Sequence, residues 1–394
     1  AIRDIGANTV QVNVAWEQVE AVEGEFDFSF VDALIEQARA NDVRLILLWF
    51  GAFKNTSPSY APAWVKLDND RFPRIVKQNG QLSYALSPLS PTTLEADKRA
   101  FVAFMQHLAR NDEDHIVIMV QVQNETGTYG SVRDYSPDAN RLFASAPPAP
   151  LLKALDADGE SWEAAFGDDA DEFFHAWFVA SYVGELAIAG KAVLDLPMYT
   201  NAALRNPVGD QDPMTYASGG PTHNVLDIWK QAAPALDLLS PDIYFRGSDE
   251  YIAVLDHYAR PDNALFVSET GNDTDFARYF FEALGRGAIG FSPFGIDYTG
   301  YSNYPLGART VTPESLAPFA SNYRLVRPFA GEWARIAFNH RVWGAARPDD
   351  SSSRRVVLGR WVVDLSFHQW QFGDIDAEWM DILSISGNDV QKPR

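Results

Sequence analysis

Short apolar runs alternate with longer helical stretches along most of this chain, and no other feature limits the possible folds as strongly. The candidate strands are rich in β-branched residues and cover residues 9–14, 43–49, 116–122, 197–200, 242–245, 264–267 and 288–291. Helical patterns lie between them, at residues 30–40, 92–109, 170–194, 251–258 and 276–286. Buried strands that alternate with helices form a parallel sheet, and seven such units exceed what most open sheets contain. The pattern therefore predicts an α/β fold, a (β/α)8 TIM barrel.

The same alternation predicts how the chain is divided. Residues 1–310 are expected to form the barrel, without its first strand, which would precede Ala1. A helical connection is expected at residues 311–345, and residues 346–394 are interpreted as a β-rich C-terminal segment. This segment is expected to be the start of a small β domain, and its truncation at Arg394 stays open.

Two local features are expected within this plan. A long loop is predicted between residues 129 and 155, because the three prolines within residues 147–150 continue neither a helix nor a central strand. In the helical connection, Trp333 and Phe338 are the predicted buried positions.

Composition excludes several classes of function. The 53 acidic and 32 basic residues give a net charge of -21, which argues against nucleic acid and against an anionic membrane surface as partners. Cysteine is absent, so disulfides, thiolate metal sites and a cysteine nucleophile are excluded. The histidines show no metal-ligand spacing and no phosphate loop or dinucleotide fingerprint occurs, so neither a metal nor a cofactor is predicted. Aromatic residues make up 13% of the chain, which suits a protein that packs sugar rings against aromatic faces.

Glutamates follow two of the predicted strands at their carboxyl ends. Glu125 comes directly after Asn124 and shortly before Gly127, and Glu269 likewise precedes Gly271. A carboxylate is badly placed for a core there and well placed for chemistry, because the carboxyl ends of barrel strands build the active site. Paired carboxylates suit glycoside hydrolysis, in which one group protonates the leaving oxygen while the other attacks the anomeric carbon or activates water.

The surroundings of these glutamates resemble a known family. The chain is similar to the clan of retaining barrel glycosidases and, within it, to a bacterial subgroup of the family 35 β-galactosidases, whose motif is Gln-x-Glu-Asn-Glu-x-Gly. The resemblance is carried by residues 121–127 (Gln-Val-Gln-Asn-Glu-Thr-Gly), 6–10 (Gly-Ala-Asn-Thr-Val), 14–17 (Val-Ala-Trp-Glu) and 130–137 (Gly-Ser-Val-Arg-Asp-Tyr-Ser-Pro).

The resemblance implies roles for four residues. Glu125 would be the acid/base and Glu269 the nucleophile, at the ends of the fourth and seventh barrel strands. Asn124 would bind the sugar 2-hydroxyl. Tyr244 would hold the nucleophile in its ionised form, with a core tyrosine as the alternative. Such a mechanism needs no cofactor.

The sequence departs from the family motif in two places. Gln123 replaces the first glutamate, and the third barrel strand ends in residues 48–55 without the acidic motif of typical members. Candidate sugar contacts are the residues Trp16, Trp49, Lys54 and Asn55, each with a packing or loop role as the alternative.

The sequence thus predicts a retaining exo-glycosidase that hydrolyses terminal β-D-galactosides of an oligosaccharide or polysaccharide. Two alternatives stay open. The same barrel could act on another glycoside (an arabinoside, glucoside or fucoside), or the chain could be a non-catalytic carbohydrate-binding fragment. The function favours the periplasm or the cell exterior, and the oligomeric state is not predicted.

Overall fold

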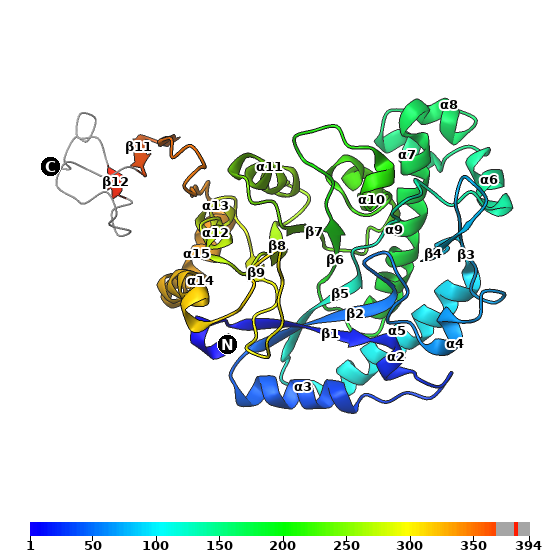
Figure 1. The fold of residues 1–394 in the computed structure, drawn as a ribbon, viewed down its shortest axis with the longest axis horizontal. Helices are drawn as coiled ribbons and strands as arrows, with labels where there is room; N and C mark the ends of the chain where they lie inside the picture. Colours follow the sequence, from blue (N-terminus) through cyan, green and yellow to red (C-terminus); the bar gives the residue numbers. More distant parts are fainter. Residues whose placement is uncertain (368–381, 385–394) are drawn as a thin grey trace. The chain divides into compact units, whose positions relative to one another are not determined.

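A sheet of seven strands forms the centre of the fold, in the order β1-β2-β5-β6-β7-β8-β9 (Figure 1). The strands are β1 (Thr9–Ala15), β2 (Arg44–Lys54), β5 (Val117–Asn124), β6 (Met198–Ala203), β7 (Leu238–Ile243), β8 (Phe266–Thr270) and β9 (Gly290–Pro293). From β1 to β7, neighbouring strands pair in parallel. Helices occupy the connections, so the fold is a partial (β/α)8 barrel and the predicted fold class is confirmed.

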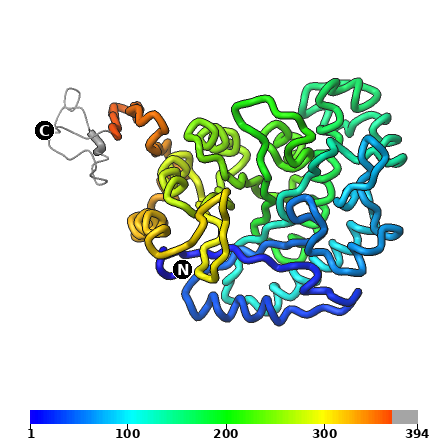
Figure 2. Tube along the Cα trace, in the orientation of Figure 1, coloured from blue at the N-terminus to red at the C-terminus, as the bar shows by residue number. Residues whose placement is uncertain are grey.

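The computed structural model describes residues 1–367 and 382–384. The chain forms two compact units, whose course can be followed along the trace in Figure 2. The larger unit comprises residues 7–242 and 262–268, and the smaller unit comprises residues 1–6, 243–261 and 269–394. The predicted limits at residues 310 and 345 stay predictions.

Helices account for most of the remaining structure. They are α1 (Ile2–Ile5), α2 (Trp16–Val19), α3 (Ser29–Ala40), α4 (Ala63–Lys66), α5 (Pro91–Asn111), α6 (Pro137–Phe143), α7 (Ala149–Ala154), α8 (Trp162–Phe166), α9 (Ala170–Lys191), α10 (Leu226–Ala232), α11 (Ser248–Tyr258), α12 (Thr274–Ala277), α13 (Phe280–Leu284), α14 (Pro313–Val326) and α15 (Ala330–Asn339). The first turn of α5 shows why these boundaries arise. Ser90 accepts a hydrogen bond from the backbone N–H of Thr93, and Pro91 follows at the first helical position.

The larger unit has apolar packing on both faces of its strands. Side chains of β2 alternate between the faces. One set packs with residues of β6, β7 and β8 into a cluster that contains Ile46, Leu48, Phe50, Tyr199, Leu238 and Phe266. On the other face, the ring of Trp49 stacks on Phe104 of α5 with 5.6 Å between the ring centroids. A strand buried on both faces explains the continuous apolar run of β2.

One stretch of the described chain, Trp162–Lys191, is long and apolar enough to cross a membrane by length and composition. In the structure, 61% of its most apolar window is buried inside the protein. A core helix passes the same test, and α9 packs against α5 and α10 in that manner.

Three expectations are wrong in detail. The predicted loop between residues 129 and 155 contains two helices, α6 and α7, because a proline stands at or next to the first position of each. The strand predicted at residues 242–245 is β7, which begins at Leu238 and already contains Pro241. Phe338 is 90% exposed instead of buried, and Trp333 is only partly covered.

Two small sheets complete the described structure. The antiparallel pair β3 (Arg74–Val76) and β4 (Leu82–Leu86) lies in the connection from β2 to α5. The strands β10 (Arg354–Leu358), β11 (Trp361–Ser366) and β12 (Ile382–Ser384) pair antiparallel. Part of the predicted β-rich segment, residues 368–381 and 385–394, lies outside the described residues.

Candidate active site

The backbone at the end of β5 adopts an unusual conformation. Gln123 and Glu125 have φ angles of 63° and 46°, and Asn55 and Thr56, just after β2, have 49° and 62°. These are four of the eight described non-glycine residues in the left-handed region. Such residues cost free energy, and they cluster at active sites, where surrounding contacts hold them in place. The conformation therefore marks the ends of β2 and β5 as a candidate site.

Backbone hydrogen bonds hold these two segments together. The N–H of Asn55 donates to the carbonyl of Asn124 at 3.1 Å, and the N–H of Thr56 donates to the carbonyl of Glu125 at 2.9 Å. Gly127, with a φ of 113°, lets the following loop approach closely, since a Cβ there would lie 2.6 Å from the carbonyl oxygen of Ala217. The position of Glu125 is thus fixed by main-chain contacts on both sides.

Glu125 is buried in the larger unit, with 7% of its surface exposed, and its carboxyl group is surrounded by polar side chains. Its Oε2 accepts hydrogen bonds from the side-chain amides of Asn55 and of Asn124, the latter at 3.3 Å. The Nζ of Lys54 lies 3.8 Å from the same oxygen. Burial raises the pKa of Glu125, and the positive charge of Lys54 opposes this shift only in part. A carboxyl group with a raised pKa keeps its proton for donation, as a general acid requires.

Asp242 and Asn201 belong to the same group of side chains, although the sequence analysis did not select them. The Oδ1 of Asn201 accepts from the backbone N–H of Glu125 at 2.9 Å, and its Nδ2 donates to Asp242 at 2.6 Å. The Asp242 carboxyl also accepts from the hydroxyl of Ser268 at 2.7 Å and bonds to the Glu125 carboxyl. Asn201 lies in β6 and Asp242 lies near the end of β7. Their place in a strand was the only feature of the sequence that could have marked them as site residues.

Gln123, which replaces a motif glutamate, has a clear structural contact. Its Nε2 donates to the carboxylate of Asp97 in α5 at 2.6 Å, and its Oε1 accepts from the backbone N–H of Phe53 at 2.9 Å. Asp97 is fully buried and also accepts from Trp49 Nε1 at 2.8 Å and from the Tyr182 hydroxyl at 2.9 Å. Burial raises the pKa of the Asp97 carboxyl. Gln123 therefore connects β5 with β2 and α5.

The structure separates the four candidate sugar contacts into two groups. Lys54 and Asn55 lie beside Glu125 and are partly exposed to solvent. Trp16 and Trp49 have no exposed surface. The indole N–H of Trp16 donates to Glu20 at 2.8 Å, and that of Trp49 to Asp97. Neither tryptophan offers a free ring face to a sugar in this structure.

Glu269 and Tyr244 lie in the smaller unit. Glu269 is the fourth residue of β8 and is partly exposed, and the hydroxyl of Tyr244 donates to its Oε2 at 2.7 Å. The structure thus brings the predicted nucleophile and its predicted partner together. A hydroxyl donor favours the ionised form of a carboxylate.

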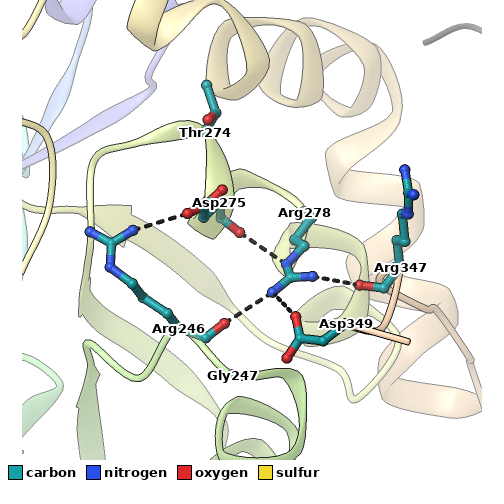
Figure 3. A pocket seen from close by; sticks show the side chains of 7 residues that line it. All are labelled: Arg246, Gly247, Thr274, Asp275, Arg278, Arg347 and Asp349. Atoms are coloured by element: carbon teal, nitrogen blue, oxygen red, sulfur yellow. Dashed lines mark hydrogen bonds and ion pairs between the residues drawn. The ribbon is translucent and has the colours of Figure 1, made fainter. Parts of the chain in front are cut away.

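A cavity of about 450 Å³ also lies in the smaller unit, and Figure 3 shows its lining side chains. Arg246, which follows Tyr244 in the chain, pairs with Asp273 at 2.6 Å and with Asp275 at 3.1 Å. Arg278 pairs with Asp349 at 2.7 Å and donates to three backbone carbonyls as well. The charges of Arg246 and Arg278 are therefore balanced by neighbouring carboxylates.

Strand-end carboxylates in a partial (β/α)8 barrel define a class, that of the barrel glycoside hydrolases. Residues 1–182 match a family described as β-galactosidase, glycoside hydrolase family 42. A β-galactosidase of Xanthomonas manihotis is 28% identical over 153 residues, which are 36% of this chain and 23% of that protein. The chain is thus similar to β-galactosidases, with family 42 indicated rather than the predicted family 35.

Solved structures agree with this fold. The β-galactosidase of Marinomonas ef1 has a TM-score of 0.59 at 15% identity, over 85% of this chain and 57% of that one. The β-galactosidase of Bacillus circulans sp. alkalophilus also scores 0.59, at 14% identity, over 86% of this chain and 54% of that one. The β-amylase catalytic domain of Paenibacillus polymyxa scores 0.57 at 12% identity, over 82% and 91%. The chain spans little more than half the length of the two β-galactosidases.

Proposed function

We propose that this chain hydrolyses terminal β-D-galactosides with retention of configuration, with Glu125 as acid/base and Glu269 as nucleophile. The observation that carries the proposal is the buried Glu125 carboxyl, whose pKa is raised by burial and whose backbone is held in a strained conformation at a strand end. The similarity to β-galactosidases supports the choice of sugar.

The topology supports a pair of carboxylates. Glu125 follows β5, Glu269 lies in β8, and both strands belong to one sheet. The carboxyl ends of the strands of a barrel lie at one rim, where substrates bind. In the proposed reaction the two groups act from opposite sides of the same glycosidic bond.

The first step forms a glycosyl-enzyme. The Glu269 carboxylate attacks the anomeric carbon, the bond to the leaving oxygen breaks, and Glu125 gives its proton to that oxygen. In the second step the Glu125 carboxylate takes a proton from water, and the water oxygen displaces Glu269 from the anomeric carbon. Two inversions restore the original configuration.

The neighbouring residues have supporting roles in this proposal. The Tyr244 hydroxyl stabilises the ionised Glu269 by its 2.7 Å hydrogen bond. Asn124, Lys54 and Asn55 surround the Glu125 carboxyl and supply donors to sugar hydroxyls. Trp16, directly after β1, and Trp49, within β2, support these strands by packing and by their indole hydrogen bonds.

Azide rescue separates the two carboxylate roles. With an activated aryl β-galactoside, Glu125→Ala should slow turnover about 10²–10⁴-fold. Added azide then attacks the glycosyl-enzyme, and the sugar azide has retained configuration. In Glu269→Ala no glycosyl-enzyme forms, so azide attacks the substrate directly and inverts the configuration. NMR of the anomeric proton distinguishes the two products.

The control is Glu113→Gln, an exposed glutamate with no hydrogen bond or ion pair in the described structure, which should leave turnover unchanged. Full activity in either alanine variant, or the same azide configuration from both, would overturn the assignment. Activity on aryl arabinosides, glucosides or fucosides but not on galactosides would be consistent with the proposed mechanism and would show that the substrate is another sugar.

A further inference from the structure

A second cavity, of about 390 Å³, lies in the larger unit within the connection from β2 to α5. Its walls come from the residues after β2, from α4 and from the β3–β4 pair, which Figure 1 labels. Its volume falls within the range of about 300–1,000 Å³ that small-molecule pockets occupy. The residues that matter for its chemistry are Ser57, Lys66, Asn69, Arg74, Leu82 and Tyr84.

This cavity adjoins the segment that holds Glu125. Ser57 exchanges two backbone hydrogen bonds with Lys54, at 2.8 and 3.0 Å, and stands two residues after Asn55. Thr56 links the two sites directly, because its N–H donates to the Glu125 carbonyl and its hydroxyl bonds to the hydroxyl of Tyr84. The cavity wall and the proposed acid therefore share one rigid segment.

Aromatic and apolar surface is exposed along this path. Tyr84 is 45% exposed and Leu82 is 60% exposed. Tyr129, on the loop after β5, is 37% exposed, and burial is the main cause that raises its pKa to about 12. Of these residues, Tyr84 and Leu82 line the cavity, and the ring of Tyr84 offers an aromatic surface there. Sugar rings present C–H faces that pack on such surfaces.

Polar donors complete the cavity. The guanidinium of Arg74 donates to Asn69 Oδ1 at 2.8 Å and to the carbonyls of Tyr84 and Lys66. These are three of its five N–H groups, and all three acceptors are neutral. In the part of the chain that the structure describes, no carboxylate pairs with Arg74, in contrast to Arg246 and Arg278 in Figure 3. Arg74 therefore has donors left for the oxygens of a ligand.

We propose that this cavity binds the leaving-group sugar of the substrate, with Tyr84 under its ring and Arg74 at its hydroxyl or carboxylate oxygens. The inference rests on the proposed function, because the acid protonates the oxygen that joins the two sugars, and the leaving group must extend from Glu125. The same cavity then holds an acceptor sugar in the second step. An acceptor O–H gives its proton to Glu125 while its oxygen bonds to the anomeric carbon and displaces Glu269.

Two substrates test the proposal, a nitrophenyl β-galactoside and a β-galactosyl disaccharide. Tyr84→Ala should lower kcat/KM for the disaccharide about 2–12-fold, since aromatic contacts contribute about 0.5–1.5 kcal/mol and 1.4 kcal/mol is tenfold. The aryl substrate, which does not fill the cavity, should change less than about twofold. In Tyr84→Ala, the yield of sugar transfer to an added acceptor disaccharide, relative to hydrolysis, should fall as well.

Tyr84→Phe keeps the ring and should keep the disaccharide rate, which separates the ring contact from the hydroxyl bond to Thr56. Leu142→Ala, an exposed apolar residue of α6, is the control and should change neither substrate. Equal effects of Tyr84→Ala on both substrates, or no effect on either, would overturn the proposed subsite. The proposed function would still stand in that case, provided that the wild-type protein cleaves these substrates. Wild-type protein that cleaves neither substrate would overturn the function and the subsite together.

Discussion

At the scale of single residues, Glu125 shows how neighbours adjust one carboxyl group. Burial raises the pKa of Glu125, and the positive charge of Lys54, 3.8 Å away, lowers it. The sequence predicted Glu125, Asn124, Lys54 and Asn55 because each stands at the carboxyl end of a predicted strand. Asp242 and Asn201 were missed because they are distant in the sequence, and only the order β5-β6-β7 in the sheet brings them to Glu125. Trp16 and Trp49 were selected for their ring type, which does not reveal burial.

Lys54→Met tests this balance. Glu125 must carry a proton in the first step, so kcat/KM falls as the pH rises through its pKa. Without the positive charge of Lys54, the pKa of Glu125 should rise further, and the basic limb of the profile should move to higher pH. The pH dependence of kcat/KM for an aryl galactoside measures this shift. Lys98→Met, in α5, is the matched control and should not move the limb. A basic limb that moves to lower pH would contradict the assignment.

At the scale of elements, periodicity located the strands well and their ends poorly. β2 continues to Lys54, past its glycine, because Asp97 and Gln123 accept hydrogen bonds from the backbone N–H groups of Ala52 and Phe53 in the extension. β7 contains Pro241, although a proline in a sequence usually indicates the end of a strand. The predicted strand therefore began only after this proline. The helices α6 and α7 each carry a proline at their start, a signal that predicts a helix as well as a loop.

The helix α9 supports the loop after β5 through one buried histidine. His175 contacts the hydroxyl of Thr128 at 2.8 Å through Nε2. Burial lowers the pKa of His175 to about 4, with Asp134 and Arg133 as the nearby charges. The native state therefore keeps the ring neutral while the unfolded chain takes up a proton below its ordinary value of 6.5.

This histidine should make stability depend on pH. Between pH 6.5 and about 4 the unfolded state binds more protons, so the free energy of unfolding falls as the pH falls. The loss should reach about 3 kcal/mol, since each pKa unit is worth about 1.4 kcal/mol. His175→Gln should flatten this part of the profile, whatever its effect on absolute stability, in urea denaturation at several pH values. The exposed His340→Gln is the control and should keep the slope. An unchanged slope in His175→Gln would contradict the explanation.

At the scale of the whole molecule, charge is the dominant property. A net charge of -21 makes the folded chain repel itself, and salt weakens this repulsion. The composition gave this property directly, because net charge does not depend on the fold. The division of the chain into two units was not accessible in this way, since it depends on contacts between residues that are distant in the sequence.

Moderate salt should therefore stabilise the protein. Raising the ionic strength from about 0.01 M to about 0.15 M shortens the Debye length from about 30 Å to about 8 Å. Tm should rise by roughly 2 °C, measured by differential scanning calorimetry in sodium chloride. The double substitution Glu36→Lys and Glu113→Lys, at exposed positions, should reduce the rise. A Tm that falls with salt would mean that ion pairs such as Arg99–Glu20 outweigh the net repulsion.

The contact between Asp97 and Gln123 explains why an amide suits position 123 of this chain. The Nε2 of Gln123 donates to a fully buried carboxylate of α5. A glutamate at the same position would bring two carboxyl groups together away from water, where neither supplies a donor as long as both are ionised. The side chains at positions 97 and 123 are therefore best understood as one unit, an acid and its amide partner.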